Sequence, residues 1–480
     1  MKKLIHVFSI ILVLILLLCL NVSALGSMDY VIDSNGREVS VPQTHISTKL
    51  IRDLGEKGGL LSEPSDVFVD SNDNIYIADS GNNRIVVLNK DGEYLNSFDC
   101  DGKLSSPSGV FVSENGDIYV ADTLNERILH LSKQGESIEE FVKPDSELLD
   151  EETTFQVSRI GISDQGYIYT IRGQYFMMID ANNEFKGYIG DNQLGFSLKR
   201  LLMRTFASKE QQAQFAKESA ASYYSFDIGS DGLIYATTGE DSSTNQIQKI
   251  NIVGENIFPE KAYGQQYYNK EINRYVNPRF VDICVDSNGV IYVIDAYSRN
   301  IFVYDQEGNM LAVFGGQGQV KGKFNQPVAI DTLSNGDVLV IDQATGYIHW
   351  FVRSSFMNNI TNAVNCYKDG KYKEAEEAWK QVLDVNANYP VANKGIGDAL
   401  YKQGDIEDAM KYYKLSDSKN GYGTAFSVFQ YDYFRAHFGL VVFLSVVIVI
   451  FLILIIVFLK KRADKFVNDY FSGGKTYEKD

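Results

Sequence analysis

The chain has 480 residues, of which 45% are hydrophobic, and it carries a formal net charge of −17. This length allows two or three domains with sizeable cores. Because nucleic-acid binding needs a basic surface, the acidic balance argues against a nucleic-acid partner.

The N-terminus has the features of a secretory signal peptide. Lys2 and Lys3 precede an apolar run from Leu4 to Leu20, and Val22-Ser23-Ala24 forms a small-residue cleavage site. We therefore expect residues 1–24 to be a signal peptide and the mature chain to lie outside the cytoplasm. The alternative is a retained N-terminal anchor.

A short β-rich sequence recurs six times, in steps of 43 to 66 residues. Its central residues are Tyr76, Tyr119, Tyr169, Tyr235, Tyr292 and Leu339. Strands and tight Gly turns flank most copies, which predicts four antiparallel strands per unit. Such a period is typical of propeller blades. The sequence predicts a mainly β protein with a six-bladed β-propeller over residues 27–355, with five or seven blades as alternatives. Residues 48–55 are predicted to complete the last blade and close the ring.

Several of these units resemble NHL repeats. The resemblance lies in Pro64-Ser65-Asp66-Val67-Phe68-Val69, in Pro107-Ser108-Gly109-Val110-Phe111-Val112 and in the stretch from Asp79 to Ile85. It implies a β-propeller fold. The family includes binding scaffolds and some enzymes, so the fold alone does not give the function.

An acid ends the second strand of several units and an arginine begins the third. The pairs are Asp79 with Arg84, Asp122 with Arg127, and Asp295 with Arg299. They could form a ring of acids for catalysis or cation binding. Their regular repetition favours a structural tie across each hairpin loop, since a catalytic centre rarely needs the same pair in every blade.

The long, irregular loops all belong to one face of the propeller, which we expect to be the binding face. One loop carries four tyrosines that could contact a sugar or a peptide: Tyr263, Tyr267, Tyr268 and Tyr275. Another contains an amphipathic helical stretch near residues 198–220. Its basic residues Lys199, Arg200 and Arg204 could contact a membrane surface or a partner, or the helix could cap the propeller.

No motif predicts a catalytic residue or a cofactor. The five histidines are scattered and show no paired spacing, so a zinc site built from histidines is not expected. Calcium bound by carbonyl and carboxylate oxygens is possible, because acidic loop ends are plentiful.

Residues 357–418 change to a helical period and are similar to two tetratricopeptide repeats. Ala363, Gly370, Ala375 and Trp379 recur 34 residues later as Gly397, Gly404, Ala409 and Tyr413. Small residues where helices cross, a Gly in the turn and an aromatic in the second helix define the pattern. The module is either a protein-binding groove or a spacer that lifts the propeller from the membrane.

An apolar run from Phe438 to Leu459 contains no charge and is long enough to cross a bilayer. Lys460-Lys461-Arg462 follow it directly, which predicts a cytoplasmic tail over residues 460–480. Both ends of the sequence thus predict a single-pass membrane protein whose bulk is extracytoplasmic.

The combination of two repeat types known for protein contacts predicts a membrane-anchored binding scaffold. Its partner would be an envelope or membrane protein at a bacterial cell surface, such as a transporter component. One alternative is an extracellular propeller enzyme, a lyase or a lactone or glycan hydrolase. Another is a sugar-binding sensor.

Overall fold

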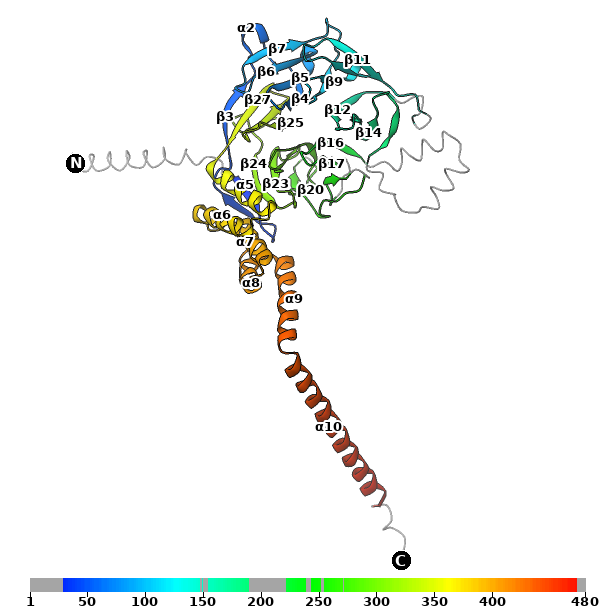
Figure 1. The fold of residues 1–480 in the computed structure, drawn as a ribbon, viewed down its shortest axis with the longest axis vertical. Coiled ribbons are helices and arrows are strands. Elements are labelled where there is room, and N and C mark those ends of the chain that lie inside the picture. Colours follow the sequence, from blue (N-terminus) through cyan, green and yellow to red (C-terminus); the bar gives the residue numbers. More distant parts are fainter. Residues whose placement is uncertain are drawn as a thin grey trace, which may run out of the picture.

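The computed structural model describes residues 29–146, 149, 154–189, 222–238, 243–251, 254–270 and 272–472. They form a six-bladed β-propeller, a helical module on its rim, and a long helix that extends away from both (Figure 1). The signal peptide predicted over residues 1–24 and the helical stretch predicted over residues 198–220 lie outside the described residues. Lys199, Arg200 and Arg204 therefore have no described position.

Each blade is an antiparallel sheet whose main strands follow one another in the chain. Blades one to three are β4 (Pro64–Val69), β5 (Ile75–Asp79), β6 (Arg84–Leu88) and β7 (Tyr94–Phe98); β8 (Pro107–Val112), β9 (Ile118–Asp122), β10 (Arg127–Leu131) and β11 (Ser137–Val142); and β12 (Val157–Ile162), β13 (Ile168–Arg172), β14 (Tyr175–Ile179) and β15 (Phe185–Tyr188). Blades four to six are β16 (Tyr223–Ile228), β17 (Ile234–Thr238) and β18 (Ile247–Ile250); β21 (Phe280–Val285), β22 (Ile291–Asp295), β23 (Asn300–Tyr304) and β24 (Met310–Gly315); and β25 (Pro327–Thr332), β26 (Val338–Asp342) and β27 (Tyr347–Arg353), joined by β3 (His45–Ile51).

The six recurring sequences are the second strands of the six blades: β5, β9, β13, β17, β22 and β26. Most residues of these strands are buried, and in β22 and β26 every residue is buried. Neighbouring blades cover both faces of each sheet, which explains why these strands are apolar on both sides. The predicted count of six blades is confirmed.

The ring closes through β3, which pairs with β27 from Ile51 opposite Ile348 to His45 opposite Arg353. The predicted closure of the last blade by an N-terminal strand is confirmed, and β3 overlaps the predicted range of 48–55 but begins three residues earlier and ends at Ile51. The strands β1 (Asp29–Ile32) and β2 (Glu38–Val41) extend the outer edge of blade five, where Tyr30 pairs with Val313.

Consecutive helices of the C-terminal region pack against one another. They are α5 (Ser355–Lys368), α6 (Tyr372–Val385), α7 (Pro390–Gln403), α8 (Ile406–Leu415) and α9 (Lys419–Ala436). A one-turn helix, α2 (Gly55–Gly58), lies in the propeller. Gly370 and Gly404 have φ of +74° and +92° in the turns after α5 and α7, a conformation that favours glycine. Ala363, Ala375 and Ala409 are fully buried where the helices meet, and Trp379 and Tyr413 are nearly so.

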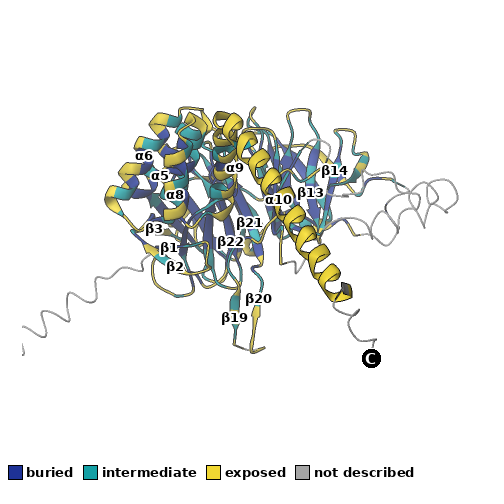
Figure 2. Cartoon of the chain, turned by 90° about the horizontal axis from the view of Figure 1, so that it is seen from below, coloured by how far each residue is buried: buried dark blue, intermediate teal, exposed yellow. Residues whose placement is uncertain are grey.

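The helical module shares a hydrophobic core with blades five and six. Phe356 and Tyr389 from the helices belong to the same buried cluster as Phe314 and Phe351 from the strands. Asn365 on α5 also donates a hydrogen bond to Asn288, which lies in the first tight turn of blade five. The module therefore sits on the tight-turn side of the rim. Figure 2 shows the β19–β20 hairpin (Tyr267–Asn269 and Arg274–Val276) projecting from the opposite side.

Among the described residues, one helix is long and apolar enough to cross a membrane, and it is α10 (Phe438–Ser472). The predicted span of 438–459 lies inside this helix. The helix continues past Lys460, Lys461 and Arg462, which the sequence placed in a tail.

Candidate interaction sites

The β19–β20 hairpin carries three of the four tyrosines predicted to bind a ligand. Tyr268 and Tyr275 face each other across the hairpin with ring centroids 5.2 Å apart and are 39% and 65% exposed. Tyr267 is partly buried beside them, and Ile272 at the tip is exposed. The loop therefore offers an apolar surface on the predicted binding face.

Tyr263 is the exception among the four tyrosines, because it is 2% exposed. Its ring packs against Phe258 and Tyr304, with centroids 5.3 and 5.5 Å away, and its hydroxyl donates a 2.7 Å hydrogen bond to the carbonyl oxygen of Pro259. Tyr263 is therefore a core residue, and its predicted role in binding is corrected.

Two of the predicted acid–arginine pairs are structural ties. The Nε atom of Arg84 donates to a carboxylate oxygen of Asp79 at 2.7 Å, and Arg127 does the same to Asp122 at 2.8 Å. Both carboxylates are buried, and their other oxygens accept backbone N–H groups from Ser62 and Ser105. These acids hold loops together, as their repetition suggested.

The third predicted pair does not form among the described residues. Arg299 has φ of +59°, the left-handed position that Asn83 and Glu126 occupy in blades one and two. The loop of blade five is one residue shorter, so its arginine falls in the turn instead of the following strand. Asp295 accepts hydrogen bonds from the backbone of Arg279 and from Ser298 instead.

The innermost strands surround a cavity of about 160 Å³ whose charged lining residues are four aspartates and one arginine. Arg159 of blade three forms an ion pair with Asp66 and approaches Asp282 to 3.4 Å. Asp227 and Asp331 line the same cavity. These were not predicted as site residues, because one sequence does not show which strand residues face a channel.

Each channel carboxylate accepts a backbone N–H from the innermost strand of a following blade. Donor and acceptor are 2.6 to 2.9 Å apart in the bonds from Val110 to Asp66, from Val285 to Asp227, from Ile330 to Asp282 and from Val69 to Asp331. Burial raises the pKa of Asp227 to about 6, and the negative charge of Asp282 adds to this shift. The acids therefore join neighbouring blades at a cost in charge burial.

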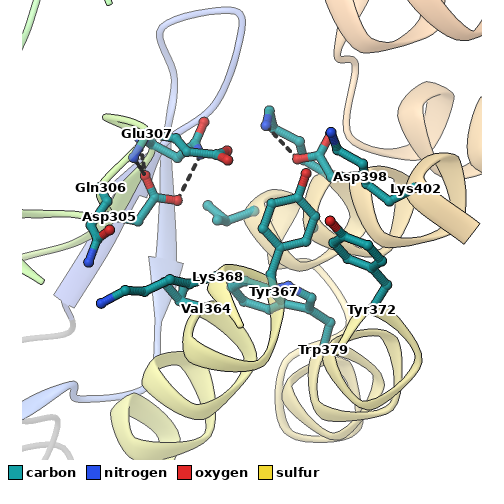
Figure 3. Close-up of a pocket in the computed structure, with 14 residues that line it drawn as sticks. Asp305, Gln306, Glu307, Val364, Tyr367, Lys368, Tyr372, Trp379, Asp398 and Lys402 are labelled. Carbon is teal, nitrogen blue, oxygen red and sulfur yellow. Dashed lines mark hydrogen bonds and ion pairs between the residues drawn. The ribbon is translucent and has the colours of Figure 1, made fainter. Parts of the chain in front are cut away.

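A groove between the helical module and blade five, the blade-five groove, contains aromatic and charged side chains (Figure 3). Its volume is about 260 Å³. One wall is the turn Asp305–Asn309 between β23 and β24, and the others are faces of α5, α6 and α7. Tyr367, Tyr372 and Trp379 supply its aromatic surface. Trp379 was predicted only as a repeat residue.

Charged groups of both signs line the blade-five groove. Lys394 forms a 2.7 Å ion pair with Asp398, whose second oxygen accepts a hydrogen bond from Tyr413 at 2.9 Å. Lys394 and Asp398 are four residues apart on a helix, a spacing that a sequence reading could have used. Sequence spacing could not show that Glu307 lines the same groove, because Glu307 lies in a turn far from α7 in the chain.

Within the described part of the chain, no group of three or more His, Cys, Asp or Glu residues is arranged to hold a metal ion. A calcium site built partly from backbone carbonyl groups stays a prediction.

Comparison with known families supports both repeat types. Residues 61–88 match the NHL repeat and residues 367–420 match the tetratricopeptide repeat. The chain carries NHL and tetratricopeptide repeats. A comparison with curated proteins gives no match.

Solved propeller structures show distant similarity to the chain. A streptogramin B lyase structure is 16% identical over 67% of this chain and 85% of that chain, with a TM-score of 0.38. A catalytically inactive virginiamycin B lyase from Staphylococcus aureus with quinupristin is 14% identical over 68% of this chain and 95% of that chain, with a TM-score of 0.41. The activity of those proteins is not carried over to this chain.

Proposed function

We propose that the protein is a membrane-anchored scaffold that holds an envelope or membrane protein beside the bilayer. The carrying observation is that the propeller and the helical module share one buried core, while α9 links that core to the apolar helix α10. Two modules of kinds known for protein contacts are thus held as one rigid unit near a membrane. The predicted signal peptide would place this unit outside the cytoplasm.

A stripe of aromatic rings on α9 supports a partner close to the membrane. The α9 stripe consists of Tyr422, Phe426, Phe429 and Tyr433, with successive ring centroids 5.9, 6.5 and 6.4 Å apart. Phe426 and Tyr433 are 36% and 52% exposed. Contiguous exposed aromatic surface is typical of protein contacts. The stripe ends where α10 begins, so a protein that covers it lies at the membrane surface.

Site-specific photo-cross-linking in intact cells tests this function. A photoreactive phenylalanine analogue replaces Tyr433 in the full-length chain, and the control replaces Leu95, which is 53% exposed on blade one. The scaffold proposal predicts a discrete adduct with one membrane or envelope protein at position 433 and none at position 95. The absence of any discrete adduct from position 433 or the other stripe positions would contradict it.

The enzyme alternative would use acids on the predicted binding face. The channel carboxylates each accept a backbone N–H group from a following blade. Calcium-dependent thermal stabilisation of the purified chain, together with turnover of a lactone or glycan, would favour that alternative. Stabilisation by an oligosaccharide without turnover would favour the sugar-binding sensor.

A further inference from the structure

The end of α10 beyond the apolar run, residues 460–472, is an amphipathic segment that we call the juxtamembrane helix. Its large apolar residues recur at a helical spacing: Phe466, Val467, Tyr470 and Phe471. Because residues three or four apart lie on the same side of a helix, these side chains form one apolar stripe. Phe466, Tyr470 and Phe471 are 72%, 73% and 72% exposed.

The juxtamembrane helix is also basic, although the whole chain carries a formal net charge of −17. Four residues of the segment are positive and two are negative: Lys460, Lys461, Arg462 and Lys465 against Asp464 and Asp469. At 3.6 residues per turn, Lys461 and Lys465 lie on the side of the helix away from the apolar stripe, and Arg462 lies at its border. Lys460 stands at the end next to the apolar run.

No other described part of the chain covers the apolar stripe. Figure 1 shows this end of α10 far from the propeller and the helical module. The rings of Tyr470 and Phe471 meet edge to face with centroids 5.6 Å apart, so they cover each other only in part. The apolar run that precedes the stripe is long enough to cross a membrane, so the nearest apolar phase is the bilayer itself.

The length of the segment determines how the apolar stripe can reach that bilayer. An upright helix would carry Phe471 about 16 Å beyond Lys460, whereas the headgroup layer is only about 5–7 Å thick on each side. The stripe therefore meets the bilayer when the juxtamembrane helix inclines toward the membrane surface. The lysines on the far side of the helix then stay within about 10 Å of the headgroups, a distance over which salt screens their charge only in part.

We propose that the juxtamembrane helix lies on the surface of the bilayer that α10 crosses and binds anionic phospholipid headgroups. Aromatic side chains enter the boundary between headgroups and acyl chains, and basic side chains are attracted to the lipid phosphates. A second copy of the chain is a poorer occupant of the stripe, because two parallel copies would bring their basic clusters together. The inference requires α10 to cross a bilayer, as the proposed scaffold does, but it requires no protein partner.

Fluorescence of the full-length protein in lipid nanodiscs tests the inference. A genetically encoded dansyl amino acid replaces Phe466 in the apolar stripe, and the control places the same probe at Asn468, on the other side of the helix. Each protein is reconstituted at one copy per nanodisc. The lipid is either phosphatidylcholine alone or an equal mixture of phosphatidylcholine and phosphatidylglycerol.

The emission of the probe at position 466 should shift to the blue when phosphatidylglycerol is present, whereas the probe at position 468 should keep its water-like emission. Replacing the two lysines together, by Lys461→Gln and Lys465→Gln, should lower the ratio of membrane-bound to water-exposed probe at position 466 by about tenfold. Water-like emission at position 466 in the anionic nanodiscs, or an equal blue shift in phosphatidylcholine alone, would overturn the inference.

A blue shift that appears only in nanodiscs loaded with two copies would assign the apolar stripe to a second chain and would also overturn the inference. The cross-linking at Tyr433 does not depend on this result. A discrete adduct at position 433 without the lipid-dependent shift rejects the juxtamembrane proposal alone. Failure of the chain to insert into nanodiscs of either composition would reject both proposals.

Discussion

The hydroxyl of Tyr389 donates a 2.7 Å hydrogen bond to the backbone carbonyl oxygen of Leu311. Tyr389 stands just before α7, and Leu311 lies in β24 of blade five. Both residues are fully buried. The bond therefore fixes the second helical repeat to the propeller inside their common core.

Tyr389→Phe keeps the ring and removes the hydroxyl donor. The buried carbonyl oxygen of Leu311 then loses this hydrogen bond. We expect the free energy of unfolding to fall by about 1–2 kcal/mol, with faster proteolysis of the helical module than of the propeller. Thermal unfolding and limited proteolysis of the purified chain measure both effects. Tyr275→Phe, on the exposed hairpin, should change neither, and an equal effect of the two variants would contradict the prediction.

Arg84, which is tied to an aspartate, and Arg299, which is not, allow a second pair of variants to be compared. Arg84→Met leaves the buried carboxylate of Asp79 without its cationic partner, and we expect a loss of about 2–3 kcal/mol because Ser62 and Asn82 still donate to it. Arg299→Met removes an arginine that holds no such tie and should cost under about 1 kcal/mol. Thermal unfolding compares the two, and a larger loss from Arg299→Met would refute this assignment.

Two helical glycines should respond in opposite directions to alanine. A Cβ at Gly397 would lie 2.9 Å from the ring of buried Tyr413, whereas a Cβ at Gly423 meets nothing within 4 Å. Gly397→Ala should destabilise the chain by about 1–3 kcal/mol through overpacking. Gly423→Ala should stabilise α9 by up to about 1 kcal/mol. Circular dichroism during thermal unfolding checks the signs, and the prediction fails if both variants shift the same way.

The raised pKa of Asp227, about 6 against an ordinary 3.8, makes stability depend on pH. At this group the folded state then binds more protons than the unfolded state between these values, so the contribution of Asp227 to stability is greatest at low pH and falls as pH rises from about 4 to 6. The shift corresponds to at most about 3 kcal/mol. Asp227→Asn should flatten this part of the curve. Thermal unfolding between pH 4 and 7 tests it, and identical slopes for both proteins would contradict it.

The blade count could be predicted from one local pattern, the apolar strand centred on Tyr76 and its equivalents. This pattern indicates both that the segment is a strand and that both of its faces are buried. Ring closure by β3 was also predictable, since the last unit lacked a fourth strand. The different position of Arg299 was readable from the sequence, because Asp295 and Arg299 are four residues apart whereas the other two pairs are five apart. The missing loop residue shifts the arginine from the strand into the turn.

The sites were less predictable than the fold. Tyr263 and Tyr275 lie close in sequence and are equally amphipathic, yet one is in the core and the other is exposed. The blade-five groove depends on contacts between the turn at Glu307 and helices far along the chain, such as α7. Such proximity is a property of tertiary packing, and no local pattern encodes it.

The pairing of β3 with β27 makes the order of synthesis important. β3 is the first strand of the ring to be made and β27 is the last, roughly 300 residues later. Until β27 emerges, the unfinished ring has open edges, which are prone to pair with other chains. Since α5 begins two residues after β27 ends, closure of the ring and docking of the helices become possible almost together. A nascent chain that stalls before Tyr347 is therefore an aggregation hazard for the cell, not a smaller working propeller.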